Sequence, residues 1–174
     1  MKNITRILSL LLISITIFSC NSNIEKENLV EEIKKIDEKL FSQKEEAINA
    51  ELANDALKKY EEYVNTFPED SLSPELLYKA SLIAYGMDDF TKATSFLERI
   101  ENKYTSYQKY GTVLFQHAFI LENGIHDKNS AKQYYQKFIN TFPNHVLTED
   151  AKNALIYIDL TDEELLKLFE SNNK

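Results

Sequence analysis

The chain has 174 residues, of which 43% are apolar and 28% are charged, with only three glycines and three prolines. This composition excludes collagen-like, low-complexity and fully disordered chains, so we expect the protein to fold. The single cysteine, Cys20, excludes an intramolecular disulfide and a cysteine-based metal site, because each needs several thiolates. The long apolar run 7–18 has 12 residues, too few to span a bilayer.

Residues 1–19 have the three parts of a secretory signal: basic residues at the start, the apolar run, and the small residue Ser19. The stretch Ile17-Phe18-Ser19-Cys20 resembles the lipobox of bacterial lipoproteins, whose cysteine is lipidated and becomes the first mature residue. This resemblance implies that Cys20 is the lipidation site. The polar residues Asn21-Ser22-Asn23, followed by mixed charges, indicate that 20–25 is a short polar tether. An uncleaved signal anchor and a secreted protein with an unmodified thiol are the alternatives.

Cleavage after Ser19 would leave 18 basic and 28 acidic residues, a net charge of −10. An acidic surface repels phosphate backbones and anionic headgroups, so we expect no nucleic-acid partner and membrane attachment through the lipid anchor only. By resemblance to enteric lipoproteins, Asn21 after the cysteine favours the outer membrane, with the protein facing the periplasm.

A repeat of 37 or 38 residues runs through the rest of the chain. The tetrapeptide Asn-Thr-Phe-Pro occurs at 65–68 and 140–143, two repeat lengths apart. Ala56, Ala93 and Ala131 each start an apolar stripe at i, i+4, i+7 and i+11, which is one face of an α-helix. The stripe continues at Tyr60, Tyr63 and Phe67, at Leu97, Ile100 and Tyr104, and at Tyr135, Phe138 and Phe142.

A second helical segment precedes each of the later stripes, over 74–85 and 110–123. Gly86 and Gly124 follow these segments, and we expect both glycines to adopt the left-handed conformation of a helix C-cap. Ala80 and Ala118 lie 13 residues before the first alanine of the next stripe, where small residues let two helices approach closely. The repeating unit is therefore a helical hairpin.

This pattern resembles the tetratricopeptide repeat, which implies an all-α, helical-hairpin solenoid of about three repeats with terminal capping helices. We expect a single repeat domain over 26–171, with repeats at about 26–68, 74–105 and 110–143 and a cap at 147–171. An amphipathic helix over 26–41 either closes the first hairpin or pairs with a second copy. Thr161-Asp162-Glu163-Glu164 is a capping box that opens a last short helix ending at Phe169.

Residues 131–145, followed by Glu149-Asp150-Ala151, resemble repeat ends in two families of bacterial envelope proteins. These are the BamD-like lipoproteins of outer-membrane protein assembly and the YbgF-like periplasmic proteins of the Tol-Pal system. The resemblance implies a scaffold that binds envelope proteins or peptides. The alternatives are an oligomerising Tol-Pal-type coordinator and a surface lipoprotein that captures a ligand; the oligomeric state stays open.

The sequence favours no catalytic or metal chemistry. His117, His126 and His145 have no second ligand at zinc-type spacing, and no phosphate loop or nucleophile motif occurs. We therefore expect no cofactor, no metal and no enzyme activity.

In tetratricopeptide arrays, ligands lie in a groove lined by the first helix of each hairpin. With Ala80 and Ala118 as the small positions, Leu77, Ser81, Ala84, Phe115, Phe119 and Glu122 would line it. A shift of one residue in the first of these helices substitutes Tyr78, Leu82 and Tyr85. The sequence leaves this register open, so the candidate groove residues are Leu77, Tyr78, Ser81, Tyr85, Phe115, Phe119 and Glu122.

Replacing the predicted lipidation site, Cys20→Ala, should abolish incorporation of a labelled fatty acid and leave the protein soluble or retained with its signal. No other residue of the expected mature chain offers an anchor. Fatty-acid labelling of the alanine variant at the wild-type level would contradict the lipidation site.

Overall fold

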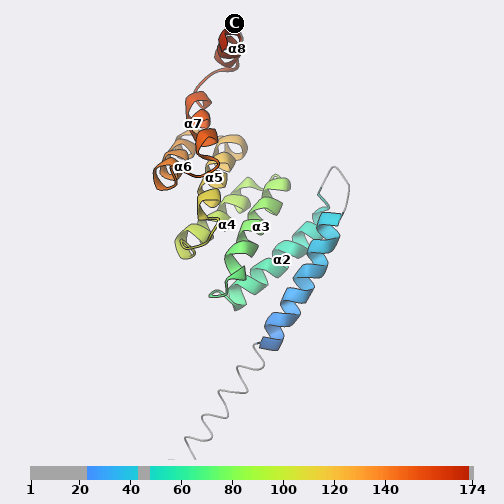
Figure 1. Cartoon of the computed structure of the whole chain (residues 1–174). Helices are drawn as coiled ribbons and strands as arrows, with labels where there is room; N and C mark the ends of the chain where they lie inside the picture. The colour runs from blue at the N-terminus through green and yellow to red at the C-terminus, as the bar shows by residue number, and fades with distance from the viewer. Residues whose placement is uncertain (1–22, 43–47, 173–174) are drawn as a thin grey trace, which may run out of the picture. The chain divides into compact units, whose positions relative to one another are not determined.

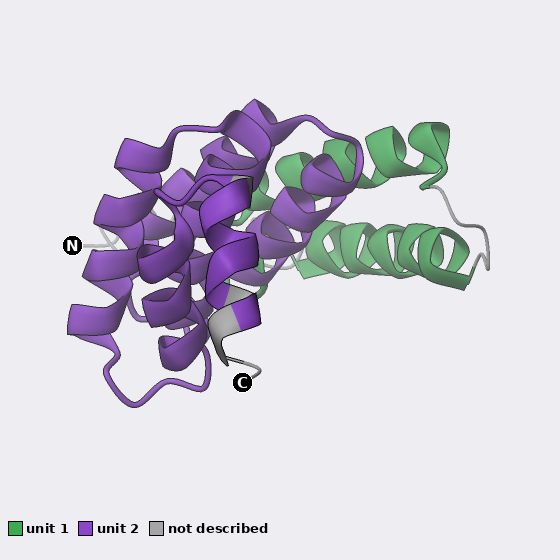
Figure 2. Cartoon of the chain, turned by 90° about the horizontal axis from the view of Figure 1, so that it is seen from above, with its two compact units in different colours: residues 1–73 green, residues 74–174 purple. Residues whose placement is uncertain are grey.

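The computed structural model describes residues 23–42 and 48–172. It divides the chain into two compact units, residues 1–73 and 74–174, drawn in different colours in Figure 2. The described residues form helices joined by turns, with no β-strand among them, which confirms the expected all-α helical-repeat fold (Figure 1). In residues 23–42 and 48–172, no helix combines the length and the apolar content that crossing a membrane requires.

Unit 1 contains a first helix over 23–42 and α2, Ala50–Thr66, which begins where the Asn49 side chain accepts hydrogen bonds from two backbone N–H groups. The two helices pack together through polar contacts along their length. Lys59 of α2 lies 2.7 Å from Glu32, and the Tyr60 hydroxyl donates to Asp37.

The apolar stripe of the first helix is buried at Leu29, Ile33 and Leu40, while Ile36 is half-buried. These side chains are therefore unavailable to a second copy of the chain while unit 1 is folded. This burial fits the expectation that the first helix closes the first hairpin. That residues 26–171 form one domain stays a prediction.

Unit 2 holds the other helices. In chain order they are α3 (Leu72–Gly86, whose first two residues belong to unit 1), α4 (Phe90–Lys103), α5 (Tyr110–Ile120), a π-helical turn (Leu121–Ile125), α6 (Lys128–Thr141), α7 (Thr148–Tyr157) and α8 (Asp162–Asn172). Packing follows the chain, since α5 lies against both α4 and α6, and α6 against α7. The predicted repeats at 74–105 and 110–143 each contain one pair of helices.

The predicted apolar stripe is confirmed in α2, α4 and α6. Its first three residues in each helix are at most 1% exposed: Ala56, Tyr60 and Tyr63; Ala93, Leu97 and Ile100; Ala131, Tyr135 and Phe138. The fourth residue caps the helix, because its backbone N–H donates to the carbonyl of the third at 2.7–2.8 Å.

The turns after these caps repeat the same hydrogen bonds. The N–H groups of Asp70, Tyr107 and His145 donate to the carbonyl of the capping residue. A second hydrogen bond completes each turn, because the N–H group three residues later donates to the carbonyl of that same Asp70, Tyr107 or His145; the donors are Ser73, Tyr110 and Thr148. The middle turn lacks the proline of the other two, so backbone hydrogen bonds rather than proline define this turn.

The expected glycine caps are wrong. Neither Gly86 nor Gly124 has a positive φ; the left-handed residues are Asp88 (φ 59°) and His126 (φ 63°), two positions later. An aspartate follows each left-handed residue and caps the next helix. Asp89 accepts a hydrogen bond from the N–H of Lys92, and Asp127 accepts one from the N–H of Ser130. The helical backbone therefore continues through both glycines before the chain turns.

The π-helical turn settles the register between α3 and α5. The turns before these helices are 37 residues apart, at Ser73 and Tyr110, whereas the left-handed residues after them are 38 apart. The extra residue is accommodated by the wider π-helical turn. Within the helices the offset is therefore 37, so that Ser81, rather than Ala80, corresponds to Ala118. Ala80 and Ser81 are both fully buried, so it is the offset of 37 residues, and not burial, that selects Ser81 as the close-approach position.

Gly124 should be required by packing rather than by backbone conformation. A Cβ at this position would lie 2.6 Å from the ring of Phe90, so Gly124→Ala forces the ring to move. We expect a loss of about 1–3 kcal/mol in the free energy of unfolding, measured by denaturant titration.

Gly86→Ala is the matched control, because Gly86 is helical and exposed. Alanine there should be neutral or stabilise by up to about 1 kcal/mol. Equal effects of the two substitutions would show that Phe90 does not impose the requirement.

Candidate functional site

Two helices of unit 2 carry matched rows of partly exposed side chains. Tyr78, Leu82 and Tyr85 lie on one face of α3, at i, i+4 and i+7. The offset of 37 residues places Phe115, Phe119 and Glu122 at the same positions of α5 and the π-helical turn. All six residues are partly exposed. We call them the aromatic face.

Aromatic contacts join the two rows. The rings of Tyr85 and Phe119 lie 6.0 Å apart, and Tyr85 also contacts Phe90 at 5.5 Å. Leu82, on the same side of α3, is 42% exposed. The rings of Tyr85 and Phe119 therefore hold each other in place, and the exposed Leu82 lies on the same side of α3 as Tyr85; we call these three residues the apolar centre.

Leu77 and Ser81 do not belong to this surface. They are 1% and 0% exposed, and Ala84 is also fully buried. The register with Ala80 as the small position would have placed them in the groove. The π-helical turn explains the difference, because its extra residue lengthens the spacing in the second hairpin only.

A charged group borders the α3 side of the aromatic face. The Lys109 ammonium binds Glu75 at 2.8 Å and lies 5.4 Å from the ring centre of Tyr78, and the Tyr107 hydroxyl donates to the same carboxylate at 2.5 Å. Burial alone would raise the pKa of Glu75, but these two donors outweigh it and lower the pKa. Glu75 is thus held as a carboxylate, and Tyr78 is held beside a paired cation.

Two residues of the face are committed to packing inside the second hairpin. Phe115 contacts the rings of Tyr135 and Phe138 edge-on, each at 5.7 Å. Glu122 accepts a hydrogen bond from the Tyr135 hydroxyl at 2.8 Å. Their main role is structural, so the surface open to a partner is centred on Leu82, Tyr85 and Phe119.

A polar cluster joins α4, α5 and α6, with His117 and Glu101 buried and Lys137 at its exposed edge. No spacing in the sequence predicts this cluster. His117 Nδ1 lies 2.7 Å from Glu101, whose second carboxylate oxygen lies 2.8 Å from Lys137. The Tyr134 ring lies 4.0 Å from the His117 ring, and burial raises the pKa of Tyr134 to about 12. His117 is 16 residues from Glu101, so only the packing of three helices brings them together.

The other two histidines lie in different surroundings from His117. His126 is an exposed turn residue, while His145 packs against Phe138 and Phe142. Within residues 23–42 and 48–172, no group of three or more histidine, cysteine or acidic side chains is placed to hold a metal ion. The predicted lipidation site, Cys20, lies outside the described residues.

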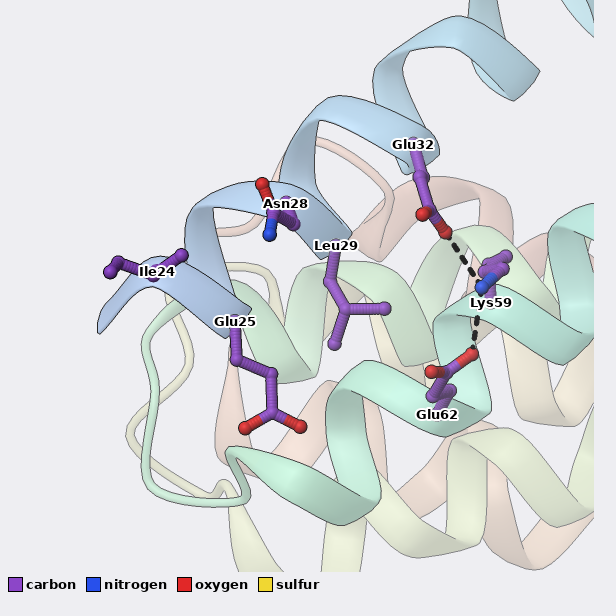
Figure 3. A pocket seen from close by; sticks show the side chains of 7 residues that line it. All are labelled: Ile24, Glu25, Asn28, Leu29, Glu32, Lys59 and Glu62. Carbon is purple, nitrogen blue, oxygen red and sulfur yellow. Dashed lines mark hydrogen bonds and ion pairs between the residues drawn. The ribbon is translucent and has the colours of Figure 1, made fainter. Parts of the chain in front are cut away.

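Unit 1 has a hollow of about 460 Å³ between its first helix and α2 (Figure 3). In the close-up, Lys59 points toward Glu32 and Glu62 and binds them at 2.7 and 3.0 Å. These hydrogen bonds raise the pKa of Lys59. The remaining lining comprises Ile24, Glu25, Asn28 and Leu29. The lysine is already paired with the two nearest carboxylates, so we interpret the hollow as a solvated helix–helix junction.

Comparison with known families identifies one repeat. Residues 112–145 match the family model of the tetratricopeptide repeat. They comprise most of α5, the π-helical turn, α6 and the following turn. A search of the curated proteins found no match. The chain therefore contains a tetratricopeptide repeat, a module that generally mediates protein–protein interactions and is typically non-catalytic.

The Glu101 cluster predicts how stability depends on pH. Burial alone would raise the pKa of Glu101, but hydrogen bonds from His117 and Lys137 outweigh it and lower the pKa below the ordinary value of 4.5. A carboxyl whose pKa is lowered on folding stabilises the fold above its unfolded pKa. This stabilisation should disappear as the pH falls from about 5 through the folded pKa.

Glu101→Gln should lower the free energy of unfolding at pH 7 by about 1–3 kcal/mol and flatten its decline between about pH 5 and 3. Urea titrations across this range provide the measurement. Glu98→Gln, at an exposed position of the same helix, is the control. A wild-type pH profile in Glu101→Gln would contradict the role of the cluster.

Proposed function

We propose that this protein is a lipid-anchored scaffold that binds protein or peptide segments in the bacterial cell envelope. The observation that carries the binding role is the apolar centre of the aromatic face. Leu82 is 42% exposed beside Tyr85 and Phe119, whose rings are already in contact. An exposed leucine beside two partly exposed rings offers a surface that an apolar side chain of a partner can cover.

The mechanism is recognition by a preformed surface. The contacts of Tyr85 with Phe90 and Phe119 fix the ring before a partner arrives, so binding costs little ordering of side chains. A partner segment would place an apolar side chain against these rings. The paired charges of Glu75 and Lys109 at one border would favour polar groups beside that anchor.

The proposed location rests on the sequence alone. Its support is the resemblance of residues 17–20 to a lipobox and the acidic balance of the expected mature chain. Attachment of Cys20 to the outer membrane, with the repeats in the periplasm, would place the aromatic face among envelope proteins. A BamD-like role in assembly and a YbgF-like role in the Tol-Pal system both agree with this arrangement.

Burial in unit 1 bears on the oligomerising alternative. A coordinator that oligomerises through residues 26–41 would need an exposed stripe, whereas Leu29, Ile33 and Leu40 are at most 7% exposed. We therefore favour the scaffold that acts through the aromatic face.

Capture of partners by crosslinking in intact envelopes tests the proposal. Replacing Leu82 and Tyr85 together by serine should reduce recovery of the crosslinked partner at least about tenfold, since apolar anchors dominate interfaces. The melting temperature is measured alongside, because Tyr85 also packs on Phe90.

Phe41→Ser is the matched control, since Phe41 is an apolar residue of the first helix and is 61% exposed. It should leave recovery unchanged. The opposite result would contradict the proposal. If Phe41→Ser abolishes recovery of the crosslinked partner while the folded Leu82→Ser, Tyr85→Ser variant recovers it fully, the partner binds the first helix instead.

A further inference from the structure

Phe90, the first residue of α4, is an aromatic side chain that the repeat does not require. It follows Asp89, the aspartate that caps α4, just as Lys128 follows the capping Asp127 at the start of α6. Lys128 is exposed, whereas Phe90 is half-buried, so a helix of this repeat can begin here without an aromatic ring. The Phe90 ring therefore has a local role, which its contacts define.

The Phe90 ring packs on the π-helical turn. A Cβ placed on Gly124 would lie 2.6 Å from Cγ and Cδ1 of this ring and 3.1 Å from its Cδ2, so the ring lies directly against the glycine backbone. The turn is itself fixed, because the N–H groups of His126 and Asp127 both donate to the carbonyl of Leu121. Such turns are rare and recur at functional sites.

The same ring contacts Tyr85 of the aromatic face. The centres of the two rings are 5.5 Å apart, and their planes are tilted by 53°. Only four residues separate Tyr85 from Phe90, in a turn closed by backbone hydrogen bonds. Tyr85 in turn contacts the Phe119 ring at 6.0 Å. A chain of contacts therefore runs from Gly124 through Phe90 and Tyr85 to Phe119.

This chain of contacts limits the conformations open to the Tyr85 side chain. A side chain on a helix surface exchanges among a few rotamers unless its neighbours block them. Without the Phe90 ring, contact with Phe119 alone would have to hold Tyr85 in place. A ring that is fixed beforehand costs less to order when a partner binds.

We propose that Phe90 is a positioning residue of the aromatic face. Resting on Gly124, it holds the Tyr85 ring against Phe119, in the position in which the apolar centre receives a partner. Phe90 acts through Tyr85 and need not touch the partner. The consequence for binding rests on the proposed function, whereas the position of Tyr85 can be measured without any partner.

Nuclear Overhauser effects (NOEs) between the Tyr85 and Phe119 rings measure this position in the full chain, with phenylalanine and tyrosine labelled selectively. We expect the NOE in the wild type, an intensity at least threefold lower in Phe90→Leu, and the wild-type intensity in the conservative variant Phe90→Tyr. The NOE between Phe115 and Tyr135, whose ring centres are 5.7 Å apart, is the control for intact packing and should persist in all three proteins.

A second pair of variants separates positioning from simple packing. Gly124→Ala forces the Phe90 ring to move, so it should weaken the NOE between Tyr85 and Phe119 although neither residue is changed. Adding Phe90→Ala removes the clash but restores no ring beside Tyr85, so the NOE should stay weak. If Phe90 mattered only through its packing on the turn, the NOE would return in this double variant, and the proposal would be wrong.

Capture of the partner by crosslinking tests the consequence for binding. Phe90→Leu should weaken capture about two- to tenfold, which corresponds to the ordering of one freed side chain, while Phe90→Tyr should leave it unchanged. An unchanged NOE between Tyr85 and Phe119 in Phe90→Leu would overturn the proposal, and so would a lost NOE with full capture of the partner. If the wild type captures no partner, the proposed function fails, whereas the NOE still decides whether Phe90 positions Tyr85.

Discussion

Close approach of helices at small, buried side chains is the constraint on which unit 2 depends. Ser81, Ala93, Ala118 and Ala131 are each 0% exposed, and in the second hairpin the two alanines lie in one core cluster. A larger side chain at these positions would separate the helices and expose the aromatic and aliphatic stripe beside them. The register of every other side chain, including those of the aromatic face, follows from which residue occupies the small position.

The same constraint connects fold and function. Leu77, Ser81 and Ala84 are buried, whereas Tyr78, Leu82 and Tyr85 lie on the accessible side of α3. The offset of 37 residues brings Phe119 to the matching place on α5, where its ring contacts Tyr85. The surface that we propose for binding thus follows from the repeat itself. The same offset continues the row to Ile156 in α7, which is 60% exposed.

Much of this fold could be predicted from the sequence, because its determinants are periodic. The buried stripes of α2, α4 and α6 and the capping box of α8 follow from residue spacing alone. The predicted left-handed caps at Gly86 and Gly124 are wrong: glycine after a helix usually adopts this conformation, but here Asp88 and His126 adopt it. Gly124 has a packing role instead, which depends on the distant Phe90 ring.

The candidate site was predicted in part. Tyr85 and Phe119 lie together on the partly exposed side of their helices, but Leu77 and Ser81 are buried. The difference is one residue in the π-helical turn, and nothing in the composition of Leu121–Ile125 distinguishes it from an ordinary helix end. The cluster of His117, Glu101 and Lys137 could not be predicted from the sequence either, because it forms only when three helices pack in a particular register.

The register of α3 is the central claim, and thiol accessibility measures it directly. In a Cys20→Ala background, Ser81→Cys and Leu82→Cys each place a single thiol in the chain. The two positions are neighbours, but position 81 is buried and position 82 is exposed. The account predicts that a maleimide reagent modifies the thiol at 82 readily and the thiol at 81 at least about a hundredfold more slowly, because reaction there requires local unfolding. Faster modification at 81 than at 82 would contradict the register and, with it, the aromatic face.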